Sequence, residues 1–175
     1  MRASALAALA VLMVTAVATA PAAQWRLFES EFDDEEKPWS EIEAQLPSYP
    51  KPQDLIPFDA GAATAHRFYI DAPSLSVGED GVVRYTLVIR AAAGSTNVSF
   101  EGMRCETKEQ KYYALGRSNG SWTRARDPKW RRVENRELNR HHSALYADFF
   151  CPDRLRMATA KQIVDSLKRS AAGLR

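Results

Sequence analysis

The clearest pattern in the chain is a two-residue alternation of apolar and polar side chains from residue 83 to residue 90. This period places every second side chain on one face of a β-strand, so the stretch is predicted to be a strand. Its apolar face is formed by Val83, Tyr85, Leu87 and Ile89.

Residues 66–117 contain further runs of this kind, separated by residues that favour turns. Gly78-Glu79-Asp80-Gly81 is a predicted hairpin loop, because Asp-Gly and flanking glycines tolerate positive φ. A second turn is predicted around Gly94. We therefore expect an antiparallel meander of four to five strands in this region.

One strand of this meander has an inconsistent pattern. Val98 and Phe100 share one face, whereas Met103 and Cys105 have the other parity. A β-bulge at Glu101-Gly102 would bring all four side chains onto the same face, so the sequence predicts a bulge there.

Two helical stripes follow the strands. The first, which Asn135 could cap and Pro152 would end, consists of Leu138, His142, Leu145 and Phe149. The second, with Thr159 as its predicted N-cap, consists of Ala160, Ile163, Val164, Leu167 and Leu174. Strands followed by helices predict an α+β fold, here an antiparallel meander sheet of four to five strands with about two helices packed on one face.

The N-terminal residues 1–22 resemble a secretory signal peptide. Arg2 supplies a positive charge, residues 5–18 are uncharged, and small residues precede a cleavage position after Ala22. The alternative is a membrane anchor, but the apolar run is shorter than a transmembrane helix requires. No cysteine lies near the cleavage position, so we expect a periplasmic protein that is not lipidated and has no transmembrane segment after cleavage.

Two segments of unusual composition precede the strands. Residues 23–45 carry eight acidic residues among large apolar ones, which is typical of a mobile, solvated arm or of an arm that docks on its own domain or a partner. Residues 46–58 contain four prolines and should be extended, as a surface segment or as a ligand for a proline-binding groove. The expected single α+β domain covers residues 46–175.

The chain contains two cysteines, Cys105 and Cys151. An even number in an exported chain predicts a disulfide, and their spacing matches neither a C-x-x-C motif nor a zinc site. In the chain-entropy view, closing a loop of this length stabilises the fold by about 4 kcal/mol.

Four segments carry a family resemblance. They are LPSYPKPQDLIPF, RFYIDAPSLSVGEDGVVRYTLVIR, NVSFEGMRC and NRHHSALYADFFCP, in this order. Together they resemble the CNP1-like family of uncharacterised exported bacterial proteins, over roughly the whole domain that follows the predicted signal. The resemblance implies an envelope-directed protein with a single family domain, and it implies no activity and no catalytic residues.

The formal net charge of +2 conceals an acidic beginning and a basic later part. Between Arg104 and Arg140 there are eleven basic and five acidic residues, a local charge of +6. The candidate binding residues are Trp122, Arg124, Arg126, Trp130, Arg131 and Arg132. They suit an anionic envelope component or an acidic protein partner, whereas export argues against nucleic acid. Alternatively, the acidic arm neutralises the segment and the tryptophans belong to the core.

His141 and His142 are the candidate catalytic or metal-binding side chains. Adjacent rings on a helix diverge by about 100°, and His142 falls in the apolar stripe, so a core role is favoured over a metal site. No sequence motif indicates a cofactor or a metal. The leading functional hypothesis is a non-catalytic envelope binding module, and the alternative is a periplasmic enzyme acting on a cell-wall or other envelope substrate, with His141 or His142 as acid or base.

Overall fold

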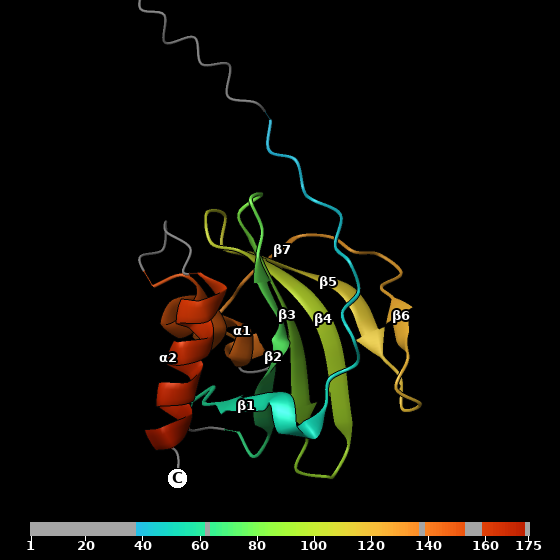
Figure 1. Ribbon diagram of the computed structural model, residues 1–175, viewed down its shortest axis with the longest axis vertical. Helices are drawn as coiled ribbons and strands as arrows, with labels where there is room; N and C mark the ends of the chain where they lie inside the picture. Colours follow the sequence, from blue (N-terminus) through green and yellow to red (C-terminus); the bar gives the residue numbers. More distant parts are fainter. Residues whose placement is uncertain (1–37, 62–63, 137–138, 153–158, 174–175) are drawn as a thin grey trace, which may run out of the picture. The chain divides into compact units, whose positions relative to one another are not determined.

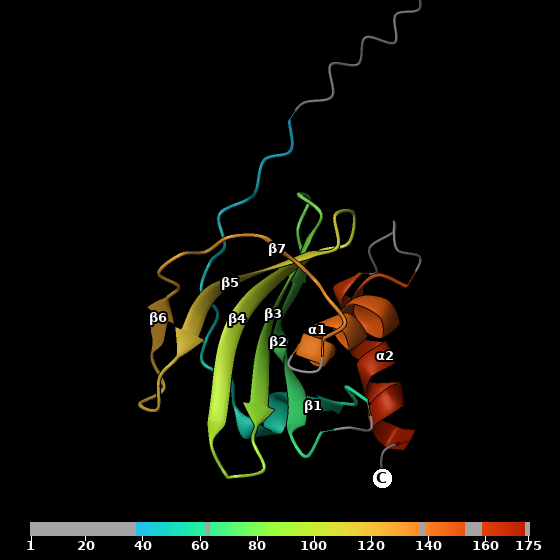
Figure 2. The same cartoon turned by 180° about the vertical axis from the view of Figure 1, so that it is seen from behind.

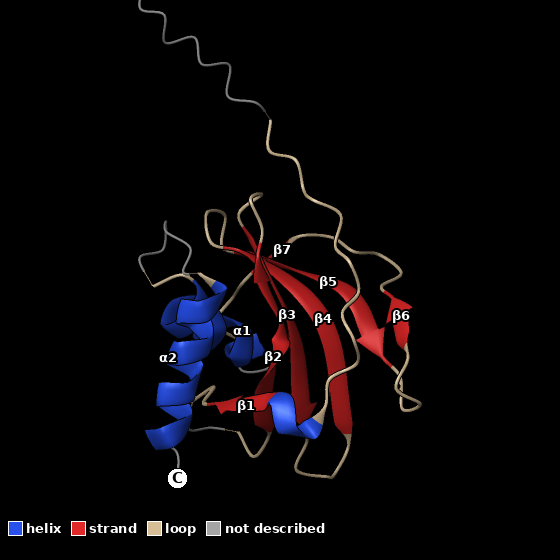
Figure 3. Cartoon of the chain, viewed as in Figure 1, coloured by secondary structure: helices blue, strands red, loops and turns tan. Residues whose placement is uncertain are grey.

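The part of the chain that the structure describes is built around one antiparallel sheet of seven strands (Figures 1 and 3). The computed structural model describes residues 38–61, 64–136, 139–152 and 159–173. The strands are β1 (Leu55–Phe58), β2 (Arg67–Val77), β3 (Val82–Arg90), β4 (Thr96–Arg104), β5 (Glu109–Gly116), β6 (Trp122–Arg124) and β7 (Arg131–Arg132). Strands β1 to β6 are neighbours in chain order, and β7 also pairs with β5.

The predicted α+β class and the antiparallel meander are confirmed, but the predicted number of strands is too low. The meander of β2 to β5 occupies the stretch in which it was expected. The additional strands lie in the proline-rich and basic segments. Strand β1 tolerates Pro57 because it is an edge strand and this residue is exposed. Strands β6 and β7 are three and two residues long, too short to produce a periodic pattern.

Strand β4 has its apolar side chains on both faces because both faces of the sheet are covered. Phe100 lies in one buried cluster with Ala114, and Met103 lies in the other with Cys105. The pairing of β4 with β3 is continuous from Thr96 to Arg104, so the bulge predicted at Glu101-Gly102 is wrong. The irregularity is in β5, where one residue is unpaired between the partners of Phe100 and Glu101.

The larger core lies between the sheet and the helices, which are α1 (Arg140–Ala144), a π-helix (Leu145–Phe150) that continues it, and α2 (Ala160–Gly173). His142, Leu145 and Phe149 of the first predicted stripe are buried in it. Within the described residues, no helix is long and apolar enough to cross a membrane.

The two predicted helix caps have different outcomes. Helix α1 starts at Arg140 and its N-cap position is Asn139, so the predicted cap at Asn135 is wrong. Thr159 caps α2 as predicted: the Gln162 backbone N–H donates to its hydroxyl, and the Gln162 side chain accepts from its backbone N–H. This reciprocal arrangement is a capping box. Leu138 and Leu174 of the predicted stripes lie outside the described residues.

The predicted disulfide is present between Cys105, directly after β4, and Cys151, directly after the π-helix. Their Cα atoms are 5.4 Å apart, and both residues are buried in the larger core. The bond therefore ties the end of a central strand to the helical layer.

The opposite face of the sheet is crossed by residues 39–49, which we call the N-terminal strap (Figures 1 and 2). Ala44 of the strap is buried against Phe100 and Ala114. For this part of the predicted acidic arm, docking on its own domain is therefore the correct alternative. The compact unit runs from Trp39 to Arg175, and the predicted signal peptide and residues 23–37 of the arm lie outside the described residues.

Candidate binding face

The six predicted binding residues lie along the outer edge of β5. Trp122 and Arg124 belong to β6, which pairs with one end of β5, and Arg131 and Arg132 form β7, which pairs with the other end. The connection between β6 and β7 carries Arg126 and Trp130. The structure thus brings all six to one edge of the sheet.

The four arginines of this edge are exposed. The structure shows no ion pair for any of them among the residues that it describes, although acidic residues lie close in sequence. Asp127 pairs with Lys129, and Glu134 pairs with Arg136. We call Arg124, Arg126, Arg131 and Arg132 the arginine edge. It is a positively charged surface whose donors face solvent.

The two tryptophans of the segment, in contrast, contact the N-terminal strap. The Trp122 indole N–H donates to the Pro47 carbonyl over 2.9 Å, and its ring lies 5.3 Å from that of Tyr49. The Trp130 ring meets Trp39 edge-on with centroids 6.0 Å apart. For the tryptophans, intramolecular packing is therefore the alternative that the structure supports.

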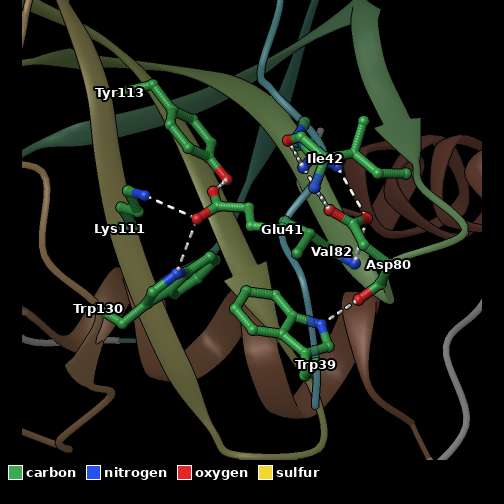
Figure 4. A network of polar contacts seen from close by, with 9 residues as sticks. Trp39, Glu41, Ile42, Asp80, Val82, Lys111, Tyr113 and Trp130 are labelled. Atoms are coloured by element: carbon green, nitrogen blue, oxygen red, sulfur yellow. Dashed lines mark hydrogen bonds and ion pairs between the residues drawn. The ribbon is translucent and has the colours of Figure 1, made fainter. Parts of the chain in front are cut away.

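A carboxylate of the strap accepts hydrogen bonds from three surrounding donors, as shown in Figure 4. Glu41 accepts hydrogen bonds from Lys111 Nζ at 2.7 Å, from the Tyr113 hydroxyl at 2.7 Å and from the Trp130 indole at 3.2 Å. Burial alone would raise the pKa of Glu41, but these hydrogen bonds outweigh it and leave the pKa below its usual value. The three donors form a seat for an ionised carboxylate.

The next residue of the strap is held by its backbone (Figure 4). The Ile42 N–H donates to Asp80 Oδ2 at 2.8 Å, and the Ile42 carbonyl accepts from Arg84 at 2.7 Å. Asp80 and Arg84 are paired with each other at 2.6 Å. Burial opposes ionisation of Asp80, but the hydrogen bonds from Arg84 and from backbone N–H groups lower its pKa below the usual value. This pair forms a clamp on the backbone of one residue rather than on a side chain.

Three glycines leave the room that these contacts require. A Cβ atom on Gly102 would lie 2.5 Å from the Tyr113 hydroxyl, and one on Gly78 would lie 2.3 Å from Asp80 Oδ1. A Cβ atom on Gly116 would lie 2.9 Å from the Tyr49 hydroxyl. Tyr113 is also the residue of β5 that has no partner in β4 at the register shift between these two strands. The sheet face is therefore shaped at several independent positions to receive the strap.

Sequence reasoning missed the seat and the clamp. Glu41 lies 70 positions from Lys111 and 89 from Trp130, so no local spacing joins them. The sequence predicts that Asp80 lies in a hairpin loop, and it does lie there. However, a turn residue gives no sign that it also binds the strap. The many large apolar residues of the acidic arm were the one available signal of docking.

The two histidines belong to α1, on the side of the sheet opposite the strap. His142 Nε2 is 2.7 Å from Glu101 Oε2, and the hydroxyls of Tyr85 and Ser99 donate to the same carboxylate. Glu101 and His142 are 0% and 1% exposed, so the predicted core role of His142 is the one that the structure supports. Burial opposes ionisation of Glu101, but the adjoining His142 and Ser99 lower its pKa below the usual value.

His141 stacks on Phe68, with ring centroids 5.2 Å apart, and lines a cavity of about 480 Å³. His66, Asn97 and Arg140 also line it, and none of its described lining residues is a carboxylate. Burial lowers the pKa of His141 to about 4, so the ring is neutral at pH 7.

The pKa of His141 predicts a loss of stability in mild acid. An unfolded histidine titrates near 6.5, so below this pH the unfolded chain binds a proton that the folded chain does not accept until about pH 4. The contribution of His141 to the free energy of unfolding should fall by about 2 kcal/mol between pH 7 and pH 5. Urea unfolding of the wild type and of His141→Gln measures this as a difference in pH slope. His66→Gln, which removes an exposed histidine, is the matched control.

Comparison of the sequence with models of protein families identifies the family of this chain. The model of the CNP1-like family matches residues 34–168. The chain belongs to the CNP1-like family. The match includes the strap and all seven strands, so the residues that dock on the sheet are part of the CNP1-like domain. Neither the curated proteins nor the solved structures contain a significant match.

Proposed function

We propose that this CNP1-like protein is an exported, periplasmic binding module that holds an anionic ligand on its arginine edge. The observation that carries the proposal is that four exposed arginines share one sheet edge and form no ion pair with any described residue. A guanidinium group presents a planar fork of donors that matches carboxylate and phosphate groups. The ligand class is an anionic envelope component, such as a lipid head group or an acidic cell-wall polymer.

The surroundings of the arginine edge also support binding. Strands β6 and β7 are hydrogen-bonded to β5, so the backbone that carries Arg124, Arg131 and Arg132 is held in place. The Trp122 and Trp130 rings anchor the same segment against the strap. A flexible polyanion would therefore meet a row of charges whose spacing is already set.

Charge reversal of the arginine edge tests this proposal. An anionic membrane attracts each nearby Lys or Arg with about 1 kcal/mol, so reversing all four residues to glutamate should weaken retention by anionic vesicles on the order of a hundredfold or more. Retention of the wild type should fall steeply with salt, because exposed charges are screened over about 8 Å at physiological ionic strength. Co-sedimentation with anionic vesicles, neutral vesicles and purified cell wall measures both effects.

A matched control reverses charge elsewhere on the surface. Lys168→Glu with Arg169→Glu changes two exposed residues of α2 and should leave retention near the wild-type value. Circular dichroism verifies that each variant is folded. Failure of the folded wild type to bind any of these anionic surfaces at low salt would refute the proposed function.

A further inference from the structure

The strap is attached to the sheet in the way that a peptide ligand is attached to a receptor. Residues 39–49 form no strand or helix, so their removal breaks no strand pairing. Trp39 is 39% exposed and Ile42 is 48% exposed, so the large apolar side chains at this end of the strap are only partly covered. The contacts that hold it are mainly hydrogen bonds, an ion pair and stacking, made by side chains and backbone carbonyls of the sheet and its loops.

The sheet side of this contact is a complete recognition surface. It contains the carboxylate seat of Lys111, Tyr113 and Trp130, and the backbone clamp of Asp80 and Arg84. It also has a place for an aromatic ring. The Arg104 guanidinium lies 3.7 Å from the centroid of the Trp39 ring, and the Trp39 indole donates to the Asp80 carbonyl at 2.7 Å.

Together, these three features bind side-chain and backbone groups of a short sequence motif. The aromatic ring, the carboxylate and the clamped backbone groups come from positions 39, 41 and 42 of one segment. The clearance left by Gly78 and Gly102 keeps the clamp and the seat in position. Lys111 supplies the positive charge that complements the carboxylate at position 41, whereas Arg84 is paired with Asp80 and Arg104 with Glu106.

We propose that this surface is a recognition site for an extended acidic peptide of a partner protein, with an aromatic residue two positions before a glutamate, and that residues 39–42 occupy the site in cis. The inference goes beyond the proposed function, because it uses side chains outside the arginine edge and names a second class of partner. The strap then acts as a tethered competitor. Because a short tether gives an effective concentration in the millimolar range, a partner peptide binds appreciably only when the strap is weakened or the partner is presented at high local concentration.

The test uses a synthetic peptide with the strap sequence PWSEIEAQ, labelled with a fluorophore, and the full mature chain. Trp39→Ala with Glu41→Ala removes the two strap side chains that occupy the aromatic place and the carboxylate seat, and it replaces no residue of the sheet. This variant should bind the peptide at least tenfold more tightly than the wild type does, as measured by fluorescence anisotropy. Adding Lys111→Ala to the variant should cost at least tenfold, and so should replacing the glutamate of PWSEIEAQ at the position of Glu41 by glutamine in the peptide.

Two results would overturn the inference. The first is no saturable binding of the peptide by the folded double variant at concentrations up to about 1 mM, the range of a tethered competitor. The second is binding that does not respond to Lys111→Ala. If the double variant does not fold, Glu41→Gln in the otherwise unchanged chain replaces it, because glutamine keeps the shape of the side chain and weakens the seat. Glu43→Gln, an exposed change outside the seat, is the matched control.

The outcome is distinguishable from that of the proposed function. If the arginine-edge variant loses vesicle and cell-wall retention while the strap variant fails to bind PWSEIEAQ, the peptide site is wrong and the proposed function stands. If the peptide binds as expected while the wild type is retained by no anionic surface, the anionic-ligand proposal fails and the recognition site stands.

Discussion

Replacing His142 with alanine is expected to lower the free energy of unfolding by about 3–5 kcal/mol, because it leaves the Glu101 carboxylate buried without its ring partner. The two side chains are 2.7 Å apart and almost completely inaccessible to water. The hydroxyls of Tyr85 and Ser99 would still donate to the carboxylate, but the contact with the His142 ring would be lost. Urea denaturation at pH 7 measures the loss.

A double-mutant cycle separates this effect from lost packing. Glu101→Gln should cost less in the His142→Ala background than in the wild type, because glutamine removes the unpaired charge while it still accepts hydrogen bonds. A metal chelator should leave the melting temperature of the wild type unchanged. A chelator-induced fall that zinc reverses would contradict the structural role of His142, since metal binding is coupled to folding.

Removing the disulfide is expected to have an effect of similar size. Cys105→Ala, Cys151→Ala and the double substitution should each cost about 2–5 kcal/mol, the range for small secreted domains. The bond closes a loop with a sequence separation of 46 and joins β4 to the end of the helical layer. Losing it therefore gives the unfolded chain more freedom and releases two elements of the same core. Thermal unfolding with and without reductant measures both contributions.

The three cysteine variants control for one another. Because each lacks the same bond, their melting temperatures should agree closely, and reductant should affect only the wild type. Peptide mapping without reduction should find one linked pair. Two thiols that react with an alkylating agent in the untreated protein would contradict the bond.

The sequence patterns that predicted structure correctly are those that depend on residues close to one another in the sequence. The alternation from Val83 to Ile89 predicts β3 because one strand face meets one core. Thr159 predicts the start of α2 because a capping hydroxyl binds a backbone N–H close to it in sequence, here that of Gln162. The bulge prediction at Glu101-Gly102 failed because it assumed that only one face of β4 is buried. The strap buries the second face, and its approach cannot be derived from the pattern of β4 itself.

The candidate site, too, could be predicted only where its signal is local in the sequence. The basic and aromatic composition located the residues of β6 and β7, since charge density is visible in a linear chain. It could not separate Trp130, which donates to Glu41, from Arg131, which is exposed. That difference depends on which carboxylate reaches the segment in space. Gly102 carried no sequence signal either, because its role is to make room for a Tyr113 side chain from the adjacent strand.

The strap also imposes an order on folding. Its partners lie 38 to 89 positions later in the chain, whereas β2 to β5 pair as successive hairpins. Local pairings form early, and contacts between distant residues carry a larger cost of loop closure. Residues 39–42 leave the ribosome before the surface that receives them exists, and Glu41 has no complete seat until Trp130 is in place. At this end of the domain, the residues synthesised first are therefore the last to reach their final positions.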